Sequence, residues 1–365
     1  MKKKVSIYFR NHLINPSNYY RIYQYLDSSL IDFSIHDSAP TGIYYFSLNS
    51  SNSMVRLLMK LILYPIMSIN VVVSLLNDIF RKPDYILIQR EIMPKYILLI
   101  QTILIKKCAN ISRIIWDYDD DIFESNEISK RERKILERES YKIVVINEYL
   151  KNLLPEGNRD KVICMPTTDG QIYKKITNAD VNYKAKTLSQ EVNLVWVGTS
   201  NGLRYVKNIL PALEKSSECL KTKGIKLRLY CISGTKLVWS SKYLEIVNVK
   251  WSRQNLIKIL KKSHFGIMPL LYENYSFGKG GFKLLQYMSA RIPVLGSSIG
   301  FNKEIIQDSF GILIDDRVNI NNWSDAIQVI CQKNYYDLSR NAYETWLTEY
   351  SFDNNKAVWN NLLNE

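Results

Sequence analysis

The sequence predicts an α/β protein made of two doubly wound, Rossmann-like domains that face a central cleft. Strand-like apolar runs alternate with helix-like segments in the first half of the chain, and the same alternation begins again after a polar segment. A length of 365 residues also exceeds what one core comfortably supports. Because parallel sheets bind ligands at the carboxyl ends of their strands, we expect the functional site in the cleft between the domains.

The first domain is expected at residues 1–175. Its short apolar runs predict buried strands, and segments with helical spacing separate them. The expected strands are 5–9, 31–38, 85–89, 113–120, 141–147 and 161–168, and the clearest helices are 17–30 and 94–107.

A linker is expected at 176–192, because the chain there is polar and lacks a clear period. The second domain then covers 193–350. Its expected strands are 193–199, 226–233, 243–251, 265–270, 292–297 and 310–315, and its expected helices are 203–216, 253–262, 282–290, 302–307 and 321–348.

The composition narrows the class of partner. A net charge of +14 suits phosphorylated small molecules, anionic lipid or nucleic acid, although solvated lysines would give the same excess. No Arg/Lys tract of the nucleic-acid-binding type occurs, so we expect no nucleic acid partner. The five cysteines are scattered without a CxxC pair, which makes a zinc site improbable and fits reduced thiols in the cytoplasm.

Residues 54–115 predict contact with a membrane surface. Lys and Arg outnumber Asp and Glu by nine to three there, and apolar runs separate the basic residues. The uncharged stretch 61–76 is too short to span a bilayer, so we expect peripheral binding at the cytoplasmic face of the membrane. The alternative is that the stretch forms two buried helices of the α/β domain.

Glycines and lysines crowd the stretch FGKGGFKLLQYMSARIPVLGSSIG, residues 277–300. Gly278, Gly280 and Gly281 allow a tight turn just before a helix that begins near Phe282. A helix start attracts phosphate, and Lys279 and Lys283 add positive charge beside it. The GxxxxGK[ST] spacing of a P-loop is absent, so the stretch predicts a different type of anion site.

The run GKGGFKLLQYMSARIPVLGSSIGFNKEII resembles the donor site of family 4 glycosyltransferases, which belong to glycosyl transferases group 1 and have the GT-B fold. YMSARIPVL and the later Gly300 and Glu304 match the family pattern. The two family glutamates are missing, because their positions fall on Gly278 and Gln286. A subgroup with the donor loop Gly-Lys-x-x-x-Lys-Leu-Leu-Gln-Tyr-Met fits better.

The resemblance extends to 16–26, 113–124, 162–173 and 195–215. It also implies that a C-terminal helix, 351–365, packs back on the first domain. The donor-binding residues that it implies are Gly198, Thr199, Ser200, Arg204, Lys207, Gly278, Lys279, Gly280, Gly281, Phe282, Lys283, Gln286 and Glu304. Those implied on the acceptor side are Ser17, Asn18 and Arg21.

The run WDYDDDIFE places four carboxylates at the end of a predicted strand. We expect Asp119 and Asp120 to act at the site, by holding sugar hydroxyls or taking the acceptor proton, with Asp117 and Asp121 as weaker candidates. Clustered aspartates also suit Mg²⁺ or Mn²⁺. The resemblance, however, implies no required metal and no other cofactor.

The function that follows is sugar transfer by a hexosyltransferase-like enzyme, with retention of configuration implied by the resemblance. The donor is a nucleoside-diphosphate-sugar and the acceptor a saccharide or a lipid-linked molecule, in the synthesis of a bacterial surface polysaccharide such as lipopolysaccharide or capsule, or of a glycolipid. Two alternatives are a nucleotide-sugar epimerase of the same fold and a non-catalytic partner of a glycosyltransferase. The missing glutamates favour the second alternative, whereas the lysines and the aspartate run oppose it.

Overall fold

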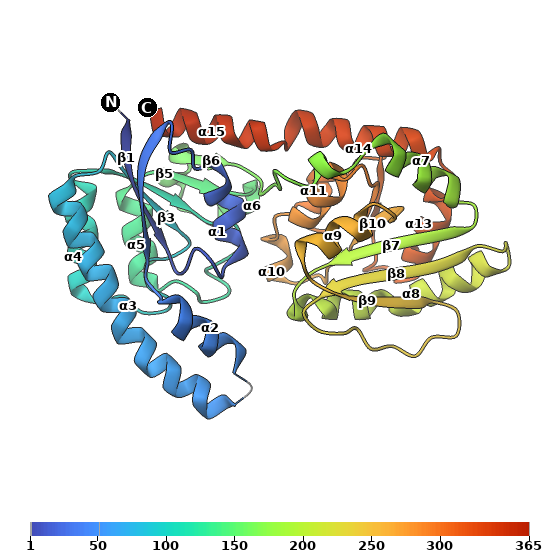
Figure 1. Cartoon of the computed structure of the whole chain (residues 1–365), viewed down its shortest axis with the longest axis horizontal. Helices are drawn as coiled ribbons and strands as arrows, with labels where there is room; N and C mark the ends of the chain where they lie inside the picture. The colour runs from blue at the N-terminus through green and yellow to red at the C-terminus, as the bar shows by residue number, and fades with distance from the viewer. Residues whose placement is uncertain (1, 51, 365) are drawn as a thin grey trace. The chain divides into compact units, whose positions relative to one another are not determined.

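The computed structural model describes residues 2–50 and 52–364, and Figure 1 labels most of their helices and strands. The chain divides into two compact units. Unit 1 comprises Met1–Thr167 and Asn355–Glu365, and unit 2 comprises Thr168–Asn354. Each unit contains one six-stranded sheet whose paired strands are all parallel.

The sheet of unit 1 has the strand order β2-β1-β3-β4-β5-β6. Its strands are β1 (Lys3–Phe9), β2 (Ile31–Asp37), β3 (Tyr85–Gln89), β4 (Arg113–Asp117), β5 (Ser140–Val145) and β6 (Val162–Cys164). The helices are α1 (Pro16–Arg21), α2 (Thr41–Asn49), α3 (Ser53–Arg81), α4 (Leu99–Ala109), α5 (Lys130–Glu139) and α6 (Glu148–Asn152), with 3-10 turns η1 (Tyr23–Tyr25) and η2 (Glu156–Lys161).

Alternate strand residues of unit 1 enter different parts of its core. Ile86 and Ile88 of β3 pack in the core that α3, α4 and α5 cover, and these helices lie side by side in Figure 1. Leu87, between them in sequence, instead lines a cavity beneath the C-terminal helix. Both faces of the sheet are therefore covered, as the continuous apolar strands predict.

Helix α3 packs on unit 1 through one stripe of side chains. Leu63, Met67, Val71 and Leu75 are buried at four-residue intervals in the core. Asp78 continues the stripe and accepts hydrogen bonds from Ser6 and Tyr8 of β1, at 2.6 and 2.7 Å. The structure therefore contains one helix of 29 residues where the sequence suggested an apolar stretch of sixteen, because the helix continues through Pro65.

The predicted helix 17–30 is much shorter in the structure. Asn15 is the N-cap of α1, and Pro16 occupies the first turn, where its missing N–H costs nothing. After η1 the chain turns at Asp27, whose side chain accepts from the Ser29 amide at 2.9 Å. This side-chain bond offers the backbone an alternative to helix.

The sheet of unit 2 has the order β12-β11-β10-β7-β8-β9. Its strands are β7 (Glu191–Val197), β8 (Lys226–Ser233), β9 (Glu245–Lys250), β10 (Phe265–Met268), β11 (Val294–Ser297) and β12 (Gly311–Ile314). The helices are α7 (Asn178–Thr187), α8 (Leu203–Lys221), α9 (Arg253–Leu260), α10 (Asn274–Phe277), α11 (Phe282–Ser289), α12 (Asn302–Ile305), α13 (Asn322–Ile330) and α14 (Tyr335–Glu349), with 3-10 turns η3 (Tyr173–Lys175) and η4 (Ser200–Gly202).

The segment 176–192, expected as a linker, instead contains α7 and the start of β7 and lies within unit 2. A capping box between Thr177 and Asp180 starts this helix, and Val181 is buried. Lys184 is also fully buried, and its Nζ donates to the carbonyls of Ala290 and Arg291 just after α11, at 3.3 and 3.4 Å. Burial lowers the pKa of Lys184 to about 7.

Helix α15 (Phe352–Asn364) begins in unit 2, and its residues from Asn355 onward belong to unit 1. Asn355 donates to the carbonyl of Pro166 at 2.7 Å, and Trp359 Nε1 donates to the carbonyl of Arg21 at 3.0 Å. These bonds hold the end of the chain on unit 1.

Candidate functional site

Each sheet has a point where the strand order reverses. In unit 2 this point lies between β7 and β10, and in unit 1 it lies between β1 and β3. Parallel sheets bind ligands just outside the carboxyl ends of the strands at such points. The residues that follow β7, β10, β1 and β3 are therefore the first places to look for a site.

The loop after β10 leads into α11 through Gly281, which has φ +61. A Cβ added at this glycine would lie 2.4 Å from Ile305 Cδ1, so both the backbone and the space favour glycine. No side chain caps α11. Its first amides are thus a suitable place for an anion, as the glycine-rich stretch predicted.

The loops after β10 and β11 pack against each other. Gly300 has φ +52, and a Cβ added there would lie 2.9 Å from the carbonyl oxygen of Ser276 and 3.1 Å from Phe277 Cα. The first loop contains α10, and its Gly278 is the C-cap of that short helix. The close approach and the positive φ explain why the sequence places glycine at position 300.

A polar pocket of about 440 Å³ lies beside this loop in unit 2, within the usual range of ligand sites. Lys279 Nζ lies 4.3 Å from the ring centroid of Tyr275. Arg204 donates to Tyr205 at 2.9 Å and pairs with Glu273. The pocket is lined by Thr199, Asn201, Gly202, Arg204, Tyr205, Tyr275 and Lys279. Two of the predicted cations therefore stand in its wall.

Lys283 and Gln286 of α11 belong to a buried polar network. Lys283 Nζ donates to Gln286 Oε1, and Gln286 Nε2 donates to Asp169 Oδ2, each at 3.1 Å. Arg253, at the start of α9, pairs with the same carboxylate through both terminal nitrogens. Burial lowers the pKa of Lys283 to about 8, although Asp169 opposes that shift. Lys283 is therefore still mostly charged at neutral pH.

Gln286 was expected to bind the donor, but the structure encloses its side chain. It is 1 % exposed, and both polar atoms of its amide bond within the network. The side chain at the position of the second family glutamate thus joins Lys283 to Asp169, so in this structure its amide is already bonded within the protein.

The other predicted donor residues differ in their exposure and in their neighbours. Gly198 follows β7 where a Cβ would lie 2.4 Å from the Trp196 ring, which explains the glycine. Ser200 and Lys207 are exposed but are not among the residues that line the pocket. Glu304 is exposed on α12, and its charge raises the pKa of Tyr350, after burial and Glu349. Gly280 and Phe282 lie in the turn before Lys283, whose Nζ is 4.6 Å from the Phe282 ring centroid.

In unit 1, Asp119 and Asp120 follow β4 and share one cation. Arg90, just after β3, donates to Asp119 at 3.0 Å and to Asp120 at 2.5 Å. Burial alone would raise the pKa of Asp119, but Arg90, Ser17 and Arg21 lower it overall. An ionised carboxylate of lowered pKa is a weak base, so Asp119 is better suited to accepting hydrogen bonds than protons.

Two predicted acceptor-side residues are enclosed in the protein. Arg21 is fully buried, pairs with the equally buried Asp117, and donates to the carbonyl of Met165. Asn18 is also buried and donates to the carbonyl of Asn11 at 2.7 Å. Neither side chain is positioned to contact a phosphate. Of the acceptor-side predictions, only Ser17 is partly exposed.

The sequence interpretation missed several charged residues at the same sheet edge. Arg10 follows β1 and pairs with Glu91, which follows Arg90. Burial raises the pKa of Glu91 to about 6 and that of Glu132 to about 8. In the described part of the chain, Oε2 of each carboxyl group has no hydrogen-bond partner. In the sequence, Arg90 and Glu91 stand directly after the buried strand YILIQ, and this position could have identified them as site candidates.

The aspartate run does not gather around one point. Asp117 pairs with Arg21, whereas Asp121 accepts from the amides of Phe123 and Glu124, at 3.1 and 2.9 Å. Within residues 2–50 and 52–364, no group of three or more His, Cys, Asp or Glu is arranged to hold a metal ion.

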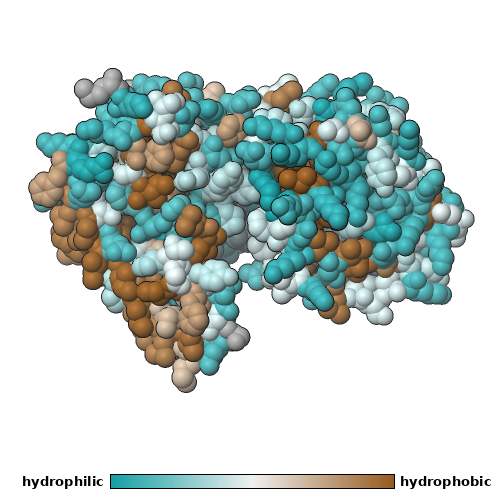
Figure 2. All heavy atoms as spheres, in the orientation of Figure 1, coloured by the Kyte–Doolittle hydropathy of each residue, from teal (hydrophilic) through white to brown (hydrophobic). Residues whose placement is uncertain are grey.

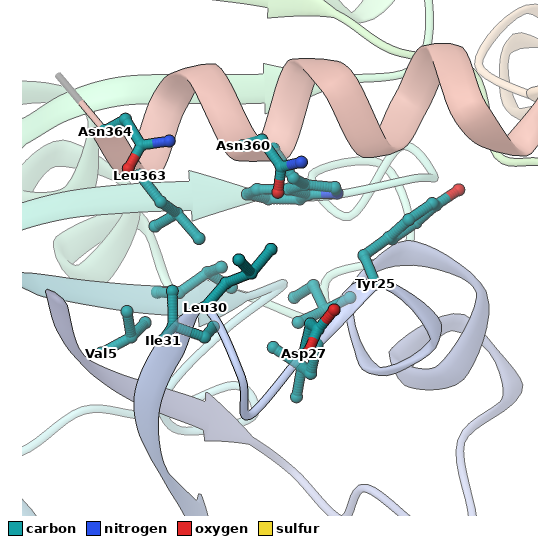
Figure 3. Close-up of a pocket in the computed structure, with 12 residues that line it drawn as sticks. Val5, Tyr25, Asp27, Leu30, Ile31, Asn360, Leu363 and Asn364 are labelled. Atoms are coloured by element: carbon teal, nitrogen blue, oxygen red, sulfur yellow. The ribbon is translucent and has the colours of Figure 1, made fainter. Parts of the chain in front are cut away.

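A second cavity of about 280 Å³ lies in unit 1 beneath α15, where Figure 3 shows Val5, Leu30 and Leu363. Its walls come from the sheet, the loop at Asp27 and α15. It is slightly smaller than typical ligand pockets and carries none of the predicted site residues.

A comparison with protein families finds a match within unit 2. Residues 191–333 match the family model Glycosyl transferases group 1. This group 1 match runs from β7 to just beyond α13 and so includes Gly281, Lys283 and the polar pocket. It does not confirm the narrower subgroup defined by the donor loop. No curated protein matches the chain significantly in sequence.

Several solved structures share the fold of this chain over nearly its whole length. Sucrose-phosphate synthase from Thermosynechococcus elongatus has a TM-score of 0.66 at 12% identity, covering 99% of this chain and 98% of its own. A glycosyltransferase from Rickettsia africae has a TM-score of 0.64 at 12% identity, with coverages of 99% and 98%. Anabaena HepE, in complex with UDP and glucose, has a TM-score of 0.62 at 9% identity, with full coverage of both chains.

At these low identities the structural likeness shows the fold alone. That fold is GT-B, with two Rossmann-like units, which confirms the predicted fold class. The group 1 match adds independent support for a transferase, because it depends on sequence.

Proposed function

We propose that the protein transfers a sugar from a nucleoside-diphosphate-sugar to a saccharide or lipid-linked acceptor. The observation that carries the proposal is the start of α11, where Lys279, Gly281 and Lys283 combine a left-handed glycine, uncapped amides and two cations. This start lies within the group 1 match. UDP is the first nucleotide to test, because HepE has been solved with UDP and with UDP-glucose.

The proposed chemistry breaks the bond between the sugar C1 and the diphosphate oxygen and forms a bond from C1 to the acceptor oxygen. Negative charge grows on the departing diphosphate. Lys279, Lys283 and the first amides of α11 stabilise that charge, and a partly buried cation does so more strongly than one in water. The stabilisation raises kcat because it increases as the bond breaks.

Asp119 and Asp120 are proposed to hold hydroxyl groups of the acceptor. Arg90 keeps both carboxylates in place and keeps Asp119 ionised. The acceptor proton leaves with the diphosphate, which becomes more basic as its bond to the sugar breaks. Retention of configuration and a role in surface polysaccharide or glycolipid synthesis are also part of this proposal.

The test is thermal unfolding with a panel of nucleoside diphosphates and their sugars, followed by product detection with the nucleotide that binds. A nucleotide at one hundred times its Kd should stabilise the fold by about 2.7 kcal/mol. Lys279→Ala and Lys283→Ala should each weaken binding by about ten- to a hundredfold, because each removes a charged contact to phosphate. Lys258→Ala, an exposed lysine on α9, is the matched control.

Three results would contradict the proposal. Absence of binding by every nucleotide would favour the non-catalytic partner. Interconversion of the donor sugar without an acceptor would favour an epimerase. A product of inverted anomeric configuration, observed by NMR, would exclude retention while leaving sugar transfer intact.

A further inference from the structure

Unit 1 exposes a large apolar surface on one side. The outward side chains of α3 and α4 include Leu61 at 63%, Ile69 at 62%, Phe80 at 81% and Leu99 at 65% exposure. Figure 2 shows brown spheres gathered where Figure 1 draws α3. Contiguous apolar surface of this kind usually marks a binding site for protein or membrane. We call the surface formed by Leu57, Leu61, Ile69, Val73, Phe80 and Leu99 the outer face.

The exposure of the outer face does not result from poor packing of α3 on unit 1. The opposite side of α3 is buried through Leu63, Met67, Val71 and Leu75. Asp78 on that side bonds to two residues of β1. Helix α3 is therefore apolar on both sides, although only one side packs on unit 1.

The charges around the outer face are mostly positive. Arg56 and Lys60 are exposed in the first turns of α3, and Lys106 and Lys107 are exposed in the last turn of α4. Of the acidic residues from 54 to 115, Asp78 and Glu91 are buried, which leaves only Asp84 exposed. An apolar strip flanked by lysine and arginine suits a bilayer with anionic headgroups.

Among the described residues, α3 is the one helix long and apolar enough to cross a membrane, as judged by length and composition. Its buried stripe argues against crossing, because spanning would separate Leu63, Met67 and Val71 from the core of unit 1. Asp78 would also lose its partners Ser6 and Tyr8. A helix that lies along the surface keeps all of these contacts.

We propose that the outer face docks unit 1 on the surface of an anionic bilayer, with α3 lying in the interface. The apolar side chains enter the boundary between headgroups and acyl chains, and the basic residues contact the headgroups. The cytoplasmic leaflet, which carries anionic lipids, is the proposed location. Membrane docking goes beyond the proposed sugar transfer, and it would bring the enzyme to a lipid-linked acceptor.

The test is flotation of the full chain with vesicles of phosphatidylcholine alone or of equal parts phosphatidylcholine and phosphatidylglycerol, without any nucleotide. Binding is expected with the anionic vesicles and should weaken in high salt, which screens the charges. Leu61→Glu with Ile69→Glu should weaken binding at least about a hundredfold, because two apolar side chains no longer enter the bilayer. Val238→Glu with Val318→Glu, at similarly exposed valines of unit 2, should change it less than about twofold.

Charge is tested separately. Lys106→Gln with Lys107→Gln should weaken binding by about twenty-five-fold, since each basic residue near an anionic surface contributes about a fivefold factor. Lys236→Gln with Lys258→Gln is the matched pair at exposed lysines of unit 2. Thermal unfolding of every variant shows whether the fold is intact.

Three outcomes would overturn the proposal. Equal binding to neutral vesicles would remove the role of charge. Resistance to extraction by alkaline carbonate would indicate that α3 spans the bilayer. Self-association that Leu61→Glu with Ile69→Glu abolishes, without vesicle binding, would assign the outer face to a second copy of the chain. Failure of nucleotide binding would leave the vesicle result unaffected, so the two proposals fail independently.

Discussion

At the scale of single residues, the most unusual group in unit 1 is the carboxyl of Glu132. It is fully buried at the start of α5, and its Oε1 accepts from the amide of Ile92 at 2.6 Å. Burial raises the pKa to about 8, although that bond opposes the shift. Between pH 4.5 and about 8, the folded chain therefore keeps this proton, whereas the unfolded chain has lost it.

Replacing Glu132 by Gln should stabilise the protein at alkaline pH. Between the ordinary pKa of 4.5 and about 8 the folded state holds more protons, so this carboxyl lowers the free energy of unfolding as pH rises. Gln keeps the acceptor oxygen and cannot ionise. The variant should match the wild type near pH 5 and exceed it by on the order of 2–4 kcal/mol near pH 8, as measured by denaturant unfolding.

Glu148→Gln is the control for this substitution. Glu148 is 56% exposed, pairs with Lys151 and accepts from Cys164 Sγ at 3.3 Å, all at the surface, so its replacement should change stability little at any pH. Parallel stability curves for Glu132→Gln and the wild type from pH 5 to 8 would contradict the raised pKa.

Sequence reasoning identified Lys279 and Lys283 from their position before and within a helix, but it missed Asp169 and Arg253. Gln286 lies 117 residues from Asp169, its partner in the network. No periodicity or spacing relates residues so far apart in sequence. Local patterns therefore suggested Lys279 and Lys283 for the proposed anion site, whereas the partners that orient Lys283 depend on tertiary packing.

At the scale of elements, the start of α11 depends on one backbone conformation. Gly281→Ala places a side chain at φ +61 and a Cβ 2.4 Å from Ile305 Cδ1. The left-handed conformation costs about 1–2 kcal/mol for a residue other than glycine, and the displaced helix start should also weaken nucleotide binding. Denaturant unfolding and titration with UDP measure the two effects.

Gly42→Ala is the comparison for this prediction. Gly42 lies in α2, and nothing lies within 4 Å of a Cβ built there. Alanine should be neutral or should stabilise the protein by up to about 1 kcal/mol, because it favours helix more than glycine does. Equal stability of the two variants would show that the conformation of Gly281 carries no strain.

Strands were easier to predict than helix ends. Apolar runs such as YILIQ correspond directly to β3, because burial on both sheet faces leaves a continuous apolar pattern. Helix α3 was harder, since only the stretch 61–76 is uncharged and Pro65 suggests a break within it. The actual helix depends on contacts along its buried stripe.

At the scale of the whole molecule, repeated alternation of strands and helices was enough to predict two doubly wound sheets. The boundaries differ, because unit 2 begins at Thr168 and its first helix lies in the expected linker. A polar helix such as α7 shows little apolar period, so only its capping box marked it in the sequence.

The division into two units predicts how a nucleotide changes unfolding. The proposed donor residues lie in 168–354, and each unit has its own core. Calorimetry should resolve two unfolding transitions. UDP at one hundred times its Kd should raise the midpoint temperature of the unit 2 transition, by an amount equivalent to about 2.7 kcal/mol of stability. At the same UDP concentration, the Lys283→Ala variant should reduce that stabilisation to about 0.4–1.4 kcal/mol. An equal shift of both transitions would contradict the assignment of the donor residues to unit 2 alone.

The contacts of α15 have a consequence for biosynthesis. Trp359 and Asn355 complete unit 1, yet the ribosome makes them only after the whole of unit 2. At roughly 5–20 residues per second, the emerging first unit waits many seconds with the cavity walls at Val5 and Leu87 uncovered. Unit 2 can mature during translation, whereas unit 1 closes last. Chaperones that act on nascent chains would therefore have most opportunity to bind the half of the protein that is synthesised first.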